Sequence, residues 1–285
     1  VQEGGEESKR GGTGRKVMAG LHGMYALASL MAPLLVANMG HVHWRMAFGL
    51  TAILPACFWV IAYLKLPTFP PRPLTRHRTT SQEHPGQKNS HIKKHKSNLS
   101  EFLFVIMVGC FVAAELTLST RLALYVRRYQ LGSIEQASLW VSAFFAWLLV
   151  GRGFFTLVHV KYSNFAILVG GLLGCSVLTF LGLWFHPAFL ALAGLTFAPL
   201  FPVAMVYARE IFGIHSDSAV AYSQTSASLM VIVMHLGIGY LSEQFGLRAA
   251  MHLGLIMGLC SLGILVYHQR LWKNSLLVHH PVLKN

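Results

Sequence analysis

Long apolar runs alternate with short polar gaps along most of this 285-residue chain. The core of a lipid bilayer is about 30 Å thick, so a helix rising 1.5 Å per residue needs roughly 20 apolar residues to cross it. Eight runs meet this requirement. Their expected limits are 17–39, 44–65, 100–126, 137–160, 165–185, 188–209, 218–241 and 247–267. The pattern therefore predicts an all-α membrane protein, a helical bundle of about eight transmembrane helices.

One polar gap is much longer than the others and divides the eight runs into two and six. It is rich in Pro, His, Lys and Arg. Its prolines stop helix propagation, and its charges keep the segment in water, so we expect a linker. The expected organisation is a stub at 1–16, two helices at 17–65, the linker at 66–99, six helices at 100–268 and a tail at 269–285.

Lys and Arg gather on one side of the predicted membrane. The stub, the linker, the tail and the loops on the same side hold 18 of the 23 basic residues, and the opposite loops hold four. Positively charged loops stay on the cytoplasmic side during insertion. We therefore expect an integral protein of the plasma membrane, or of the inner membrane in a bacterium, with both termini and the linker in the cytoplasm.

Composition narrows the function classes further. Only 12% of the residues are charged, too few to cover a soluble domain of this size. The net charge of +13 could suit nucleic acid, but the basic residues form no continuous face, so no nucleic acid partner is expected. The four cysteines lie singly in apolar runs, and the linker histidines lack tight ligand spacing. We expect no metal site and no cofactor.

Glu115 is the one acidic residue deep inside an apolar run. It lies about 15 residues beyond Ser100, roughly 22 Å from the cytoplasmic surface. A carboxylate facing lipid there would cost several kcal/mol. We interpret Glu115 as a group for substrate hydrogen bonding or proton exchange; the alternative is a protonated or paired carboxyl that only holds helices together. Arg121 lies about 600° further around the helix, so we expect no ion pair between the two.

Further polar side chains interrupt two other runs. His22 and Tyr25 are three residues apart and share a helix face, and Gln224 and Ser228 are four apart, with His235 farther along. Each set is expected either to line a solute path or to bond a neighbouring helix.

Prolines and glycines mark expected bends and close contacts. Pro199 and Pro202 lie within one run, where they remove backbone donors and predict a kink that would help gating. Gly170 and Gly174 have the small-x-x-x-small spacing that lets helices approach closely.

Four short stretches resemble the major facilitator superfamily, and within it the branch of fucose-type sugar:proton symporters. They are similar to that family's fifth, seventh, eighth and tenth helices. The stretches are Leu21-His22-Gly23-Met24-Tyr25 with Ala32-Pro33-Leu34, Ala114-Glu115 with Leu122 and Tyr125, Gly151-Arg152, and Phe201-Pro202. In that family a long cytoplasmic linker joins two six-helix halves, so the resemblance implies that the chain lacks the first four helices. The acidic coupling residues that this branch carries in helices one and four would then be missing.

The resemblance implies a secondary active transporter, not an enzyme, that moves a small polar solute such as a sugar by alternating access, coupled to protons. Arg152 would belong to a Gly-Arg turn that helps hold the inner gate shut, with snorkelling to the membrane surface as the alternative. Two other functions stay open. One is a truncated or non-transporting membrane protein, and the other is a membrane-embedded enzyme, for which we find no nucleophile and base motif.

Overall fold

The computed structural model describes residues 23, 25–34, 44–65, 94–158 and 160–279. Within them all regular secondary structure is helical, which confirms the predicted all-α fold class. A short helix at Tyr25–Leu34 comes first. The other α-helices are α2 (Trp44–Lys65), α3 (Lys94–Tyr129), α4 (Ile134–Leu157), α5 (Asn164–Trp184), α6 (Ala188–Phe197), α7 (Leu200–Phe212), α8 (Ser216–Phe245) and α9 (Leu247–His279), and a 3-10 turn at Gly213–His215 joins α7 to α8.

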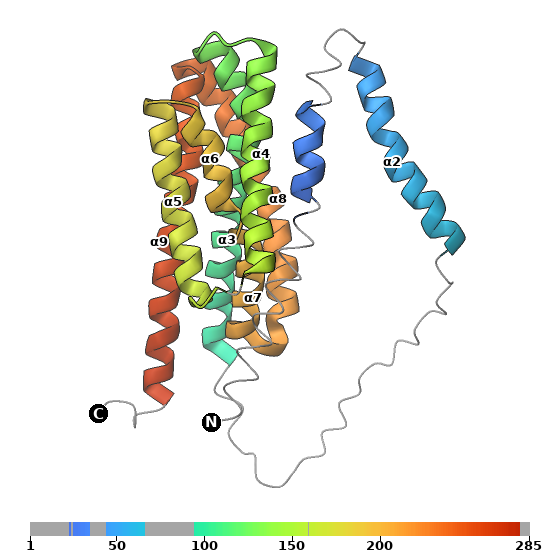
Figure 1. The fold of residues 1–285 in the computed structure, drawn as a ribbon. Coiled ribbons are helices and arrows are strands. Elements are labelled where there is room, and N and C mark those ends of the chain that lie inside the picture. Colours follow the sequence, from blue (N-terminus) through green and yellow to red (C-terminus); the bar gives the residue numbers. More distant parts are fainter. Residues whose placement is uncertain (1–22, 24, 35–43, 66–93, 159, 280–285) are drawn as a thin grey trace. The chain divides into compact units, whose positions relative to one another are not determined.

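The chain divides into two compact units. The larger contains residues 1–37 and 98–285, and the smaller contains residues 38–97. In the larger unit α3 to α9 run alongside one another as a bundle (Figure 1). The smaller unit contains α2, whose bounds are those of the second predicted run. The predicted stub and almost all of the linker lie outside the described residues, as do parts of the first run and of the tail.

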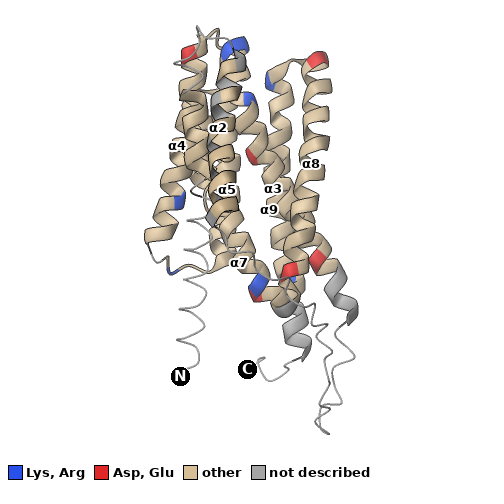
Figure 2. Cartoon of the chain, turned by 90° about the vertical axis from the view of Figure 1, so that its right-hand side faces the viewer, with Lys and Arg blue, Asp and Glu red and all other residues tan. Residues whose placement is uncertain are grey.

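Six helical segments of the described residues are long and apolar enough to cross a membrane, with α6 and α7 together forming one of them. Each matches one of the six runs predicted after the linker. Most of the described charged residues lie toward the two ends of these helices (Figure 2). The segments are Leu99–Tyr129, Ile134–Leu157, Asn164–Trp184, Ala188–Phe212, Ser216–Phe245 and Leu247–Lys273.

A tight turn joins α3 to α4, so that the two helices run antiparallel (Figure 1). The turn from α3 to α4 uses Leu131 in a left-handed conformation, with φ 54°. Ser133 then caps α4, because its side chain accepts a hydrogen bond from the Gln136 amide while the Gln136 side chain accepts one from the Ser133 amide. This hairpin places the middle of α3 beside the later part of α4.

The span that contains the two prolines is interrupted at the place where a kink was predicted. α6 ends at Phe197 and α7 begins at Leu200, with Pro199 between them and Pro202 buried in α7. Each proline lacks the amide proton that would bond the carbonyl four residues earlier, so the regular helix cannot continue through this point. A role for the break in gating stays a prediction.

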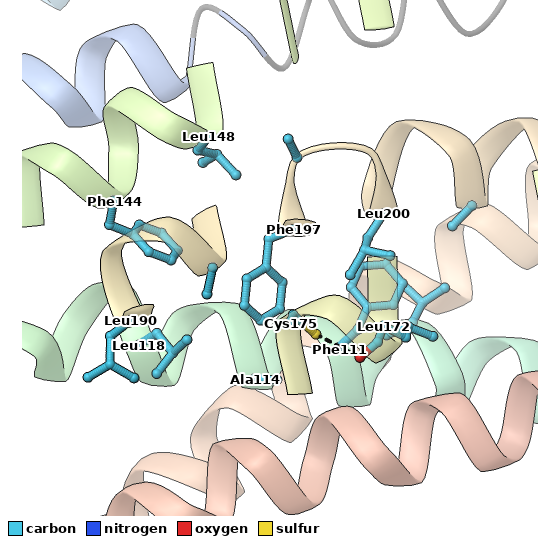
Figure 3. Packing of buried hydrophobic residues seen from close by; sticks show 14 of the residues in the cluster. Phe111, Ala114, Leu118, Phe144, Leu148, Leu172, Cys175, Leu190, Phe197 and Leu200 are labelled. Carbon is cyan, nitrogen blue, oxygen red and sulfur yellow. Dashed lines mark hydrogen bonds between the residues drawn. The ribbon is translucent and has the colours of Figure 1, made fainter. Parts of the chain in front are cut away.

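The core is tightest where α4 and α6 meet. Phe144 and Leu148 of α4 pack beside Phe197 and Leu190 of α6 (Figure 3). Gly194 makes this possible, because a Cβ there would lie against the carbonyl oxygen of Phe144 and 3.2 Å from the amide nitrogen of Leu148. The two backbones therefore touch, which only glycine permits here.

Of the two glycines of α5 that were predicted to allow close helix packing, Gly174 does so and Gly170 does not. A Cβ at Gly174 would approach Thr196 Cγ2 to 2.8 Å, as close packing requires. A Cβ at Gly170 would meet nothing within 4 Å, whereas one at Gly171 would lie 2.6 Å from Leu200 Cδ2. The packed face of α5 thus contains Gly171 and Gly174, and its centre is turned by about 50° from the predicted face of Gly170 and Gly174.

Candidate functional site

Glu115 and Arg152 form an ion pair inside the bundle. The distance from Glu115 Oε1 to Arg152 Nη2 is 3.8 Å, and the two residues are 8% and 2% exposed. Glu115 lies close to the midpoint of the Leu99–Tyr129 span. Because α3 and α4 are joined by a tight turn, the later part of α4 returns to this depth and brings Arg152 there.

The pair explains how a carboxylate is tolerated at this depth. Moving either charge alone from water into an apolar interior costs several kcal/mol, and their mutual attraction offsets that cost only when they lie close together. The distance of 3.8 Å is within ion-pair range but longer than a direct hydrogen bond. The two groups therefore attract each other electrostatically, but these two atoms do not form a direct hydrogen bond.

Tyr25 connects this pair to the surface of the larger unit. Its ring centroid is 5.7 Å from the guanidinium carbon of Arg152, within the range of a cation–π contact. Its edge packs on Phe145 of α4 with a centroid distance of 6.5 Å. Tyr25 itself is 48% exposed. An exposed phenol, a buried guanidinium and a buried carboxylate thus follow one another inward.

Arg152 lies farther inside the protein than the sequence indicated. It was expected at the cytoplasmic end of its span, but its side chain lies against Glu115, which is near the middle of the α3 span. Its side chain is buried against Glu115 rather than extended toward water, so snorkelling does not describe it in this structure. A Cβ at the preceding Gly151 would meet Ala198 and the Leu195 carbonyl, which places α4 directly against the break between α6 and α7.

The predicted polar stripe lies on α8, whose apolar stretch is the least buried among the six candidate spans. Gln224 and Ser228 are exposed, and the Ser228 hydroxyl donates to the Gln224 carbonyl at 3.1 Å within the helix. None of the described contacts joins either residue to Glu115. His22, the expected neighbour of Tyr25, lies outside the described residues.

Three polar contacts between helices have partners that the sequence did not identify. Arg121 Nη2 of α3 lies 3.2 Å from His235 Nδ1 of α8. Near the other end of α3, Ser100 Oγ lies 2.7 Å from Nε2 of the buried His268, and the Tyr207 hydroxyl donates to Gln269 Oε1 at 2.7 Å. A helical repeat shows which face of one helix is polar, but it does not show which helix packs on that face. The available signal in the sequence was a histidine within an apolar run, since such a polar side chain needs a hydrogen-bond partner from another helix.

Tyr125, one of the residues that carried the family resemblance, has a packing role in this structure. It is buried, and its hydroxyl donates to the Leu183 carbonyl at 3.2 Å, which ties α3 to α5. Among the described residues, no group of three or more His, Cys, Asp or Glu side chains is arranged to hold a metal ion.

Comparison with known proteins adds one finding. The family model of the Major Facilitator Superfamily matches residues 14–190. That match includes α2, the linker and the α3–α4 hairpin that carries Glu115 and Arg152. No curated protein and no solved structure matches the chain.

Proposed function

The chain belongs to the Major Facilitator Superfamily of membrane transporters, and from this premise we propose that it moves a small polar solute by alternating access, driven by protons. Membership and the apolar helices make it an integral membrane transporter. The proposed solute is a sugar, because four stretches of the sequence resemble the fucose-type branch. We further propose that both termini and the linker face the cytoplasm, for which the unequal distribution of Lys and Arg is the support.

The observation that carries this proposal is the buried pair of Glu115 and Arg152. A buried ion pair contributes little to stability compared with apolar side chains of similar volume, so its presence in the middle of an apolar bundle favours a functional role. We propose that Glu115 alternates between two states. As a carboxylate it pairs with Arg152, and when it takes up a proton it frees the guanidinium to bind the solute.

Tyr25, Gln224 and Ser228 would bind the solute. All three are exposed, and all carry hydroxyl or amide groups that can exchange hydrogen bonds with a sugar. Because Tyr25 makes a cation–π contact with Arg152, a solute bound at Tyr25 would alter the interaction between Arg152 and Glu115.

The break at Pro199 and Pro202 is the proposed gating element. It touches α4 at Gly151, next to Arg152. A change of bend there would move α4 against α3, and would thereby lengthen or shorten the distance between the two charges. Proton binding and gate movement would be linked through this contact.

The test replaces Glu115 with glutamine in the full chain, reconstituted into liposomes. With an inward proton gradient, wild type should accumulate at least one sugar from a panel that includes fucose, galactose and glucose. If this carboxyl carries the coupled proton, E115Q should lose gradient-driven accumulation, so that the solute only equilibrates across the membrane. Radiolabelled uptake at imposed pH gradients is the measurement.

E243Q provides the matched control, since Glu243 is exposed near the end of α8 and should leave accumulation unchanged. Wild-type coupling in E115Q would remove this carboxyl from the mechanism. A wild-type protein that transports none of these sugars would contradict the proposed sugar solute.

A further inference from the structure

Arg121 is a charged side chain in the α3 span, and none of the described residues supplies it with a negative partner. It lies eight residues before Tyr129, about 12 Å from the end of the span. In the part of the chain that the structure describes, no carboxylate oxygen lies within 4.0 Å of it, and its one hydrogen-bond partner is His235 Nδ1 at 3.2 Å. Its Nε is buried without a hydrogen-bond partner.

This arrangement leaves one positive charge unbalanced. An arginine keeps its proton under all ordinary conditions, and His235 can accept its hydrogen bond at Nδ1 only as a neutral ring. A neutral imidazole supplies a lone pair but no negative charge. Arg152 differs from Arg121 in this respect, because Glu115 balances it. Since an uncompensated charge within a membrane span is costly, Arg121 calls for an anion from outside the described chain.

The described residues leave the surroundings of Arg121 partly uncovered. Arg121 and His235 are both partly exposed, and Ser228 is exposed. At 100° per residue, His235 and Ser228 lie within about 20° of each other around α8, on the face of the predicted stripe. They are separated by about 10 Å along the helix, which a solute of hexose size and the two side chains can bridge.

We propose that Arg121 and His235 bind the carboxylate of a hydroxyl-bearing solute, so that the transported sugar is a sugar acid rather than a neutral sugar. This inference rests on the proposed transport function and names its substrate class. A guanidinium holds a carboxylate through two parallel hydrogen bonds, and the two terminal nitrogens of the partly exposed Arg121 side chain can donate them. One unbalanced positive charge matches the single negative charge of a carboxylate better than the double charge of a phosphate ester. The neutral His235 tautomer that accepts at Nδ1 keeps an Nε2 proton for the solute.

Matched pairs of probes test the proposal on the purified full chain: glucuronate against glucose, and galacturonate against galactose. Within each pair the probes differ only in a carboxylate replacing a hydroxymethyl group. Binding is measured as the concentration-dependent rise in unfolding temperature. Wild type should bind at least one acid more tightly than its neutral partner. R121Q should weaken that binding by at least about 30-fold, as expected for loss of one partner of a buried charge pair.

Two further variants separate a binding role from a structural one. R121K keeps the positive charge and should keep the preference for the acid over the neutral sugar, with weaker binding than wild type. R128Q removes a charge from the exposed end of the same helix and should bind the acid as wild type does.

The inference is overturned if neither acid binds more tightly than its neutral partner, or if R121Q binds the acid as well as wild type does. Proton-coupled uptake of a neutral sugar with no preference for the acid would also overturn it, while leaving the proposed function intact. Binding of the acid without any transport would support the anion site but would contradict the proposed transport function.

Discussion

R152Q is expected to destabilise the protein by about 3–5 kcal/mol, because it leaves the Glu115 carboxylate buried without its counter-charge. Glu115 is 8% exposed and lies near the middle of its span, so water cannot replace the lost partner without opening the bundle. The double variant E115Q/R152Q removes both charges together, and should recover most of the stability lost in R152Q. The measurement is the unfolding midpoint of the purified full chain in detergent.

R127Q is the control for charge removal, since Arg127 is exposed at the end of α3 and should change stability by less than about 0.5 kcal/mol. The comparison of single and double variants isolates the interaction between the two side chains. A double variant as unstable as R152Q would show that Arg152 contributes by packing rather than by balancing Glu115.

G194A should be the most damaging of the single-methyl substitutions in the α4–α6 contact. The added Cβ would press on the carbonyl oxygen of Phe144 and the amide nitrogen of Leu148. These are backbone atoms of a neighbouring helix, so no rotamer change relieves the contact and the two helices must separate. Overpacking of this kind costs about 1–3 kcal/mol and occasionally more. Detergent unfolding of purified protein measures it.

G170A gives the matched control, because a Cβ at Gly170 meets nothing within 4 Å. Alanine also favours a helix over glycine by up to about 1 kcal/mol, so G170A should be neutral or slightly stabilising. Equal destabilisation by G170A and G194A would contradict the close approach of α4 to α6.

The sequence was sufficient to predict the helices of the larger unit, because the length of an apolar run is set by the thickness of the bilayer. The depth of Glu115 followed from counting residues along one helix, and the broken span followed from the chemistry of Pro199 and Pro202. The absence of an ion pair within α3 between Glu115 and Arg121 also followed from helix geometry. These are properties of a single segment.

Properties of helix pairs were not predictable in the same way. Arg152 was assigned to the cytoplasmic end of its span because the turn before α4, and hence the depth at which α4 returns along α3, was unknown. The contact of Arg121 with His235 joins residues 114 positions apart, and neither residue type nor spacing specifies such a partner. Gly170 and Gly171 differ by one position, and the small-residue spacing alone does not tell which of them faces the neighbouring helix.

The most direct test of the central claim, that this bundle alternates between openings on the two sides of a membrane, is labelling of S228C with a membrane-impermeant maleimide. The background is the full chain with its native cysteines replaced, since Cys57 and Cys260 are exposed. L173C on α5 is the control, because Leu173 is exposed and apolar at a similar distance from both ends of its span. L131C in the turn after α3 and K88C in the linker calibrate the sidedness of the vesicles.

We predict that S228C reacts both in right-side-out and in inside-out vesicles, while L173C reacts in neither. L131C should react only from the outside, and K88C only from the cytoplasmic side. If S228C is as unreactive as L173C in both kinds of vesicle, the polar face of α8 does not line a path through the membrane, and the account of this chain as an alternating-access transporter fails.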